Sequence, residues 1–248
     1  MRQVTYRSVL EEAFGLLGLT LEEAATNEVT EMTTHVNRRL RLGWEYFPWP
    51  ELMRLEPRAK AGDGSAGWYI PWEASGSEPL GEVFGVYTGD PRTSPTVSEV
   101  GYGLSDRGVE LLPGQVPETP WVSYRLRPVR MTAAQIDGTR GFAAGELGYY
   151  AADGNVYQAG ASGAAVGATP DSDPAAWTLV PFPALLAPYV AYGAYVDFLK
   201  GDRAQEKAKL SESDAQALLD EEILKIVGQQ NQRARGWNVR QRAAPHGW

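Results

Sequence analysis

The chain has 248 residues, a formal net charge of −8 and a hydrophobic fraction of 43%. This length allows one large domain or two small ones, each with a proper core. The acidic balance argues against a general nucleic-acid-binding protein, because such a protein needs a basic face to displace counterions from phosphates. The absence of cysteine excludes disulfides, thiolate catalysis and cysteine-based zinc sites. No apolar run approaches about 18 residues, so we expect no transmembrane helix, and residues 1–17 lack the features of a signal peptide.

Two helices are predicted at the N-terminal end. Over residues 5–18, apolar side chains recur at helical spacing, and Gly18 can end the helix. Thr20 and Glu23 have the spacing of a capping box, which predicts that the second helix starts there. This helix runs to about Leu42, where Gly43 is expected to stop it.

The next stretch, GWEYFPWPEL from Gly43 to Leu52, holds two Trp, one Tyr, one Phe and two Pro. Three interpretations are open: a platform for a ligand, a plug within the core, or a surface that another chain covers. If another chain covers it, the best candidate contacts are Trp44, Phe47 and Trp49, because large aromatic side chains commonly anchor interfaces.

The middle of the chain has the pattern of a β-rich region. Residues 61–79 are rich in Gly, Ser and Pro and are expected to form a loop. Residues 80–129 contain short β-prone runs separated by turn residues, which predicts a small antiparallel sheet. Residues 141–180 continue this pattern, and Asp153-Gly154 between two β-prone runs predicts a hairpin.

The helical pattern returns near Pro183, and residues 202–234 form the longest helical stretch, which is polar with a narrow apolar stripe. The last 14 residues, from Arg235, are expected to be extended. No acidic residue follows Glu222, so the acidic chain ends in a basic tail. This difference in charge suggests that the tail binds a partner of its own. We expect the tail to anchor to another chain, with disorder as the alternative; the candidate contacts are Arg235, Trp237, Arg240, Arg242 and Trp248.

These elements predict an α+β fold, because helices with single apolar stripes on both sides of a β region most simply form one bundle. The expected parts are a helical bundle of residues 1–60 and 181–234, a β-rich insertion of residues 61–140, a hairpin module of residues 141–180, and an extended C-terminal tail of residues 235–248.

Few residues suggest catalysis. The two histidines, His35 and His246, lie in no recognisable motif. The adjacent glutamate pairs on helices point about 100° apart, so they do not converge on one substrate. No phosphate loop, dinucleotide fingerprint or metal-ligand spacing is present. We therefore predict no enzyme activity, no catalytic or metal-binding residues and no cofactor.

The hairpin module resembles the small carbohydrate-binding modules of chitinases. The residues that carry this resemblance are Phe142, Gly145, Tyr149, Tyr150, Tyr157, Ala159, Pro170 and Trp177. Aromatic faces can stack on sugar rings, so the resemblance implies carbohydrate or host-surface binding as one function. The alternative is that Tyr157 and Trp177 form the core of a small structural module. The loop GASGAAVGA has no aromatic residue to form a sugar platform, which favours the structural alternative.

Nearly the whole chain resembles the head–tail connector (adaptor, or head-completion) proteins of tailed bacteriophages. The resemblance rests on the helix pair that ends in NRRLRLGWEYFPWPEL, on the β insertion with GVELL and WVSYRLRPV, and on the segment WTLVPFPALLAPYVAYGAYVDFLKGD with the Gln-rich helix after it. These motifs are patterns of packing and include no catalytic signature.

The resemblance implies a structural protein of the virion neck. Such proteins form a ring, usually of twelve copies, that joins the portal to tail or stopper/nozzle proteins and surrounds the channel for genomic DNA. Twelve copies would carry a charge of about −96, which would let DNA pass without specific binding. In this setting we expect the stretch from Gly43 to Leu52 to pack partly on its own bundle and partly on a neighbouring copy, with an entirely intramolecular plug as the alternative.

Overall fold

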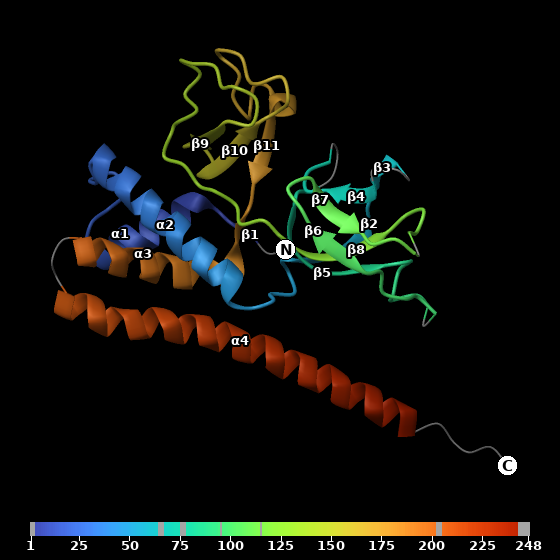
Figure 1. Ribbon diagram of the computed structural model, residues 1–248. Helices are drawn as coiled ribbons and strands as arrows, with labels where there is room; N and C mark the ends of the chain where they lie inside the picture. The colour runs from blue at the N-terminus through green and yellow to red at the C-terminus, as the bar shows by residue number, and fades with distance from the viewer. Residues whose placement is uncertain are drawn as a thin grey trace. The chain divides into compact units, whose positions relative to one another are not determined.

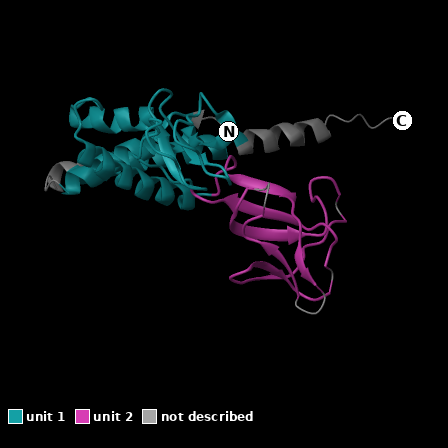
Figure 2. Cartoon of the chain, turned by 90° about the horizontal axis from the view of Figure 1, so that it is seen from above, with its two compact units in different colours: residues 1–47, 129–248 teal, residues 48–128 magenta. Residues whose placement is uncertain are grey.

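The computed structural model describes residues 3–63, 67–74, 78–94, 96–114, 116–201 and 205–242, and within α4 its side-chain description covers residues 208, 209 and 211–229. The chain forms two compact units, residues 1–47 with 129–248 and residues 48–128 (Figure 2). Helices and antiparallel sheets are both present, which confirms the expected α+β class.

The first unit contains the helices and the hairpin module (Figure 1). Its helices are α1 (Tyr6–Leu17), α2 (Thr26–Tyr46), α3 (Ala187–Gly201) and α4 (Gln205–Arg242), with short 3-10 turns at η1 (Pro174–Ala176) and η2 (Ala184–Leu186). Strands β1 (Gln3–Val4) and β12 (Phe182–Pro183) pair just before α1 and α3, respectively. Thus helices from both ends of the sequence share one unit.

The ends of α2 differ from the sequence prediction. Thr20 and Glu23 form a turn, in which Glu23 accepts the Thr20 N–H at 2.9 Å, and the helix starts only at Thr26. At the other end α2 passes through Gly43 to Tyr46. A Cβ at Gly43 would lie 2.9 Å from Cε1 of Tyr189 on α3. This glycine therefore permits close helix packing and is not a stop signal.

The hairpin module forms as predicted. Strands β9 (Leu147–Tyr150), β10 (Asn155–Ala159) and β11 (Trp177–Val180) make an antiparallel sheet in the order β11-β10-β9. Asp153 accepts the Asn155 N–H at 3.0 Å, and Gly154 has a φ of 75°, the left-handed conformation that such a turn needs.

The module and the segment before it are joined to the helical unit by specific hydrogen bonds. The side-chain amide of Asn37 on α2 donates to the Met131 carbonyl at 3.0 Å and accepts the Met131 N–H at 2.7 Å. The Arg7 N–H at the start of α1 donates to the Gly154 carbonyl at 2.9 Å. Residues 129–140 therefore join the helical unit, although the sequence placed them in the β insertion.

The second unit starts at residue 48 and consists of two antiparallel sheets, so the predicted boundary at residue 61 was too late. One sheet has the order β2-β8-β5 and the other β3-β4-β7-β6. The strands are β2 (Met53–Pro57), β3 (Ala61–Asp63), β4 (Gly67–Pro71), β5 (Leu80–Tyr87), β6 (Tyr102–Leu104), β7 (Gly108–Leu111) and β8 (Trp121–Leu126). The expected loop of residues 61–79 thus contains β3 and β4. Both sheets contribute to one core, which includes Ile70, Leu80, Val109 and Val122.

Candidate functional site

The aromatic stretch after α2 is mostly interior. Trp44 is 1% exposed and Trp49 is fully buried, so the chain itself covers both rings. Phe47 is half-buried, and Tyr46 at 55% exposure is the open aromatic side chain of this stretch. The structure thus corrects the expectation that Trp44 and Trp49 offer surface to a neighbouring copy, and it favours the intramolecular plug for these two residues.

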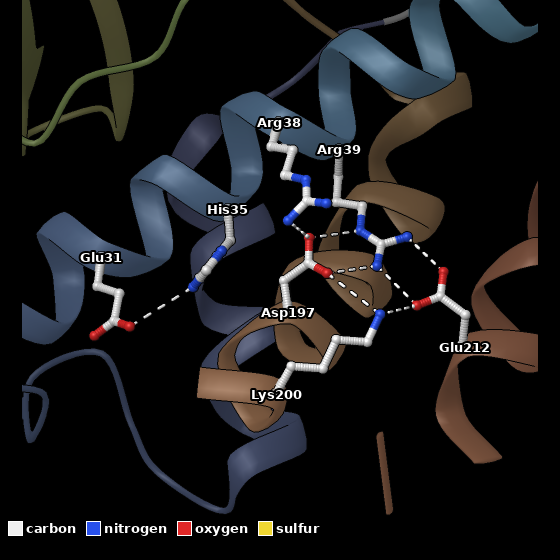
Figure 3. A network of polar contacts seen from close by, with 7 residues as sticks. All are labelled: Glu31, His35, Arg38, Arg39, Asp197, Lys200 and Glu212. Carbon is white, nitrogen blue, oxygen red and sulfur yellow. Dashed lines mark hydrogen bonds and ion pairs between the residues drawn. The ribbon is translucent and has the colours of Figure 1, made fainter. Parts of the chain in front are cut away.

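A buried charge cluster joins three helices at the start of α4 (Figure 3). Arg39 on α2 is 5% exposed, and Asp197 on α3 is 4% exposed. The Arg39 guanidinium donates from Nε and Nη2 to the two oxygens of Asp197, at 2.8 and 2.6 Å. It also donates from Nη1 and Nη2 to the oxygens of Glu212 on α4, at 2.7 and 2.9 Å. One guanidinium therefore binds two carboxylates, each through two hydrogen bonds.

Two further cations complete this cluster. Lys200 donates to Oε2 of Glu212 at 2.7 Å and lies 3.7 Å from Oδ1 of Asp197. Nη1 of Arg38 lies 3.9 Å from Oδ2 of Asp197. A Cβ at Gly193 would lie 2.6 Å from Cδ of Arg39, so α3 needs a glycine where the arginine stem crosses it.

The cluster changes the protonation equilibria of its members. The hydrogen bonds from Arg39, assisted by Lys200, lower the pKa of Glu212 to about 2. For Arg39, burial opposes the charge, but hydrogen bonds to Glu212 and Asp197 outweigh it and raise the pKa. Both groups therefore remain charged near neutral pH, and the cluster holds the first turns of α4 against α2 and α3.

Helix α4 extends well beyond the last of its described side chains that is buried. Its buried side chains, Ala208, Ala215 and Leu219, lie on one face of the first half. Further along, and up to residue 229 where the described side chains end, none is buried. Leu224 is 71% exposed and Val227 is 38% exposed. We call residues 223–242 the distal segment of α4.

The conformation of the distal segment differs from the extended tail that the sequence predicted from Arg235 onward. Positions 235, 237, 240 and 242 lie in the last turns of α4, because the helix continues through Gly236 to Arg242. The residues at these positions, Arg235, Trp237, Arg240 and Arg242, therefore belong to a helix and not to an extended tail. Trp248, the last predicted contact, lies outside the described residues.

A groove of about 260 Å³ lies between α1, the start of α2 and the hairpin module. Leu10, Leu21, Ala24 and Val29 give it apolar walls, and the other lining residues are Tyr6, Arg7, Glu22, Thr26, Ala133, Gln135, Tyr149 and Ala151. At its edge, Arg7 donates to Glu11 and Glu22, each at 2.6 Å. We call this the α1–α2 groove.

The aromatic residues of the module are engaged with other protein groups. Tyr149 is 8% exposed and contacts Tyr6 edge-on, with ring centroids 5.8 Å apart. The hydroxyls of Tyr150 and Tyr157 donate to Asp171 and Asp153, at 2.6 and 2.5 Å. Trp177 is 7% exposed and packs in the module core with Phe142. These contacts favour the structural interpretation of the module over a sugar platform.

Groups that could perform chemistry are sparse in the part of the chain that the structure describes. Among the described residues, no group of three or more His, Asp or Glu side chains could hold a metal ion. In the same part of the chain, no helix is both long and apolar enough to cross a membrane. Nε2 of His35 lies 3.7 Å from Oε1 of Glu31, and the imidazole ring contacts the Phe198 ring edge-on. His35 therefore lies at the edge of the helical core.

The charge cluster, the most specific polar feature described in the helical unit, was not predicted from the sequence. A usable signal was present, because Asp197 interrupts the apolar run YVAYGAYVDFL. A carboxylate in a buried helix needs a cationic partner, and Arg38 and Arg39 on the predicted second helix were candidates. The acceptor Glu212 could not be found in this way, because no local sequence pattern shows which residue of α4 lies opposite Arg39.

Comparison of the chain with models of known protein families, with curated proteins and with solved structures finds no match.

Proposed function

We propose that the protein is a structural assembly component, a ring-forming adaptor that joins the portal to the tail in the neck of a bacteriophage virion. The observation that carries this proposal is the distal segment of α4, a long helical arm that starts from a firmly anchored base. A helix of 38 residues spans about 57 Å, yet its last buried side chain among those described is Leu219. Such an arm is suited to contact another protein chain.

The anchor supports the same proposal. The buried guanidinium of Arg39 binds Asp197 and the partly exposed Glu212, and this holds the base of α4 against α2 and α3. A buried ion cluster is a weak source of stability but can specify one arrangement of helices. An assembly protein needs this property, because each copy must present its contact segment in the same direction.

The acidic charge of the chain is compatible with a ring around DNA. A net charge of −8 per copy gives a ring a large negative potential. Like-charge repulsion would let genomic DNA pass through the channel without specific binding. No residue of the chain is assigned a catalytic role in this proposal, and it involves no cofactor.

The direct test is the oligomeric state of the full chain. We expect the purified protein, alone or mixed with the portal protein of the same genome, to form closed rings that are visible by negative-stain electron microscopy, with a mass near twelve copies in mass photometry. Retention on chitin or host polysaccharide by a chain that remains monomeric under both conditions would instead support the carbohydrate-binding alternative and overturn the proposal.

A further inference from the structure

From the distribution of charge and exposed apolar surface, we infer that the distal segment of α4 docks on the α1–α2 groove of a second copy of this chain. This inference rests on the proposed function, since it names the contact between neighbouring copies of the ring. Three observations carry it: opposite charge on the two surfaces, an exposed apolar pair on one and an apolar groove on the other.

The charges of the two surfaces are opposite and equal in size. Residues 223–242 contain five basic side chains, Lys225, Arg233, Arg235, Arg240 and Arg242, and no acidic one. Residues 3–31, which form α1, the turn and the start of α2, contain six glutamates and one basic residue, Arg7. The formal charges are therefore +5 and −5, and such complementarity favours encounter and fixes orientation.

The distal segment carries an exposed apolar pair, and the α1–α2 groove has apolar walls that such a pair could contact. Leu224 and Val227 lie one turn apart on α4 and are exposed. The α1–α2 groove has a volume of about 260 Å³ and walls of Leu10, Leu21, Ala24 and Val29. Since a water molecule takes up about 30 Å³, the groove has room for several waters, which apolar side chains would displace. Burial of apolar area at the centre of a charged contact gives affinity, while the charges give specificity.

Helical spacing places two of the five basic positions on the face of α4 that carries Leu224. Positions 235 and 242 are 11 and 18 residues beyond Leu224, which is close to three and five full turns. They therefore lie on the same face of the helix as Leu224. A groove that receives this face of α4 would contact Leu224 at one end and the positions of Arg235 and Arg242 further along.

The contact is between two different surfaces, so it is heterologous. A heterologous contact that repeats around a rotation axis closes into a ring, whereas contact between two identical surfaces gives a two-fold dimer. The proposed docking thus provides the geometry that a ring requires.

The experiment exchanges the charges of the two surfaces in the full-length chain. One variant carries Arg235→Glu and Arg242→Glu on the distal segment, and the other carries Glu11→Lys and Glu22→Lys at the groove. We expect each variant alone to assemble at least about tenfold more weakly than the wild type, because like charges then face each other. An equimolar mixture should recover assembly, because each altered surface meets its altered counterpart.

Matched controls separate docking from loss of fold. Leu224→Glu should abolish assembly, whereas Leu104→Glu, at a leucine that is 65% exposed in the second unit, should leave it unchanged. Arg130→Glu, at another exposed arginine, is the control for the arginine changes. Circular dichroism should show helical content near that of the wild type for every variant. Raising the ionic strength from 0.1 to 1 M should weaken wild-type assembly, because the screening length falls from about 10 to about 3 Å.

The outcomes distinguish this inference from the proposed function. Wild-type rings combined with full assembly of both charge variants would overturn the docking and leave the function standing. Loss of assembly in the distal-segment variant alone, with an unaffected groove variant, would show that α4 meets a different surface. If the distal-segment variant forms rings but no longer binds the portal protein, the portal is the partner and the inference is wrong. A wild-type chain that forms no assembly under any condition overturns both.

Discussion

Replacement of Arg39 by methionine should destabilise the helical unit strongly, because it leaves the Asp197 carboxylate in the interior without its main partner. Asp197 is 4% exposed and receives two hydrogen bonds from Arg39. Removing one partner of a buried ion pair costs about 3–5 kcal/mol. Lys200 at 3.7 Å and Arg38 at 3.9 Å remain near the carboxylate, so we expect a value near the lower end, about 3 kcal/mol.

Two companion variants test the reasoning. Glu212→Gln removes a carboxylate whose side chain is 41% exposed, and solvent screening limits its contribution, so we expect a loss of about 1 kcal/mol or less. The double change Arg39→Met with Asp197→Leu removes both buried charges and should recover most of the stability that Arg39→Met loses.

Differential scanning calorimetry or urea unfolding of the full chain provides the measurement. For a unit of this size, about 3 kcal/mol corresponds to a fall in Tm of roughly 6–12 °C. The β unit of residues 48–128 serves as an internal reference if it unfolds in a separate transition. A loss below about 0.5 kcal/mol for Arg39→Met, or a double variant no more stable than the single one, would refute the idea that the buried carboxylate depends on this arginine.

Three other perturbations have outcomes set by the structure. Trp49→Glu should unfold the protein rather than only block assembly, since Trp49 is fully buried; normal helical circular dichroism with lost assembly would contradict this. Trp177→Ala should destabilise the hairpin module by about 3 kcal/mol, as expected for a buried aromatic residue, which hydrogen exchange of β9 to β11 can measure. Because the pKa of Glu212 is lowered from 4.5 to about 2, its contribution to stability is complete above pH 4.5 and is lost as the pH falls towards 2. Acid titration of the unfolding free energy should therefore show a smaller decrease over this range in Glu212→Gln than in the wild type.

The predictable parts of this fold were those with a local signal. The hairpin around Asp153-Gly154 was found because a turn of this type needs a residue that accepts a positive φ. The first helix was found because its apolar side chains recur at helical spacing. In contrast, Gly43 looked like a helix stop, since the contact that makes it useful comes from Tyr189, far away in the sequence.

The same distinction applies to the candidate site. The basic charge after Glu222 can be read from the sequence, and it pointed to the C-terminal segment as an interaction surface. Its helical conformation was missed because Gly236 and the adjacent Trp237 resemble a break in the pattern. The burial of Trp44 and Trp49 was also missed, since the amount of surface available to cover an aromatic stretch depends on tertiary packing and not on the stretch itself.

The anchored base of α4 gives the helix the mechanics of a lever. From Leu219, the last buried side chain among those described, to Arg242, the helix covers roughly 35 Å. A tilt of about 10° at the base would move the far end by roughly 6 Å, more than one helical turn. Strain applied at the far end is thus transmitted to the packed base, where Arg39 binds Glu212 and where Ala208, Ala215 and Leu219 are buried. A load on this arm would be resisted by this cluster of charges together with the buried contacts of Ala208, Ala215 and Leu219.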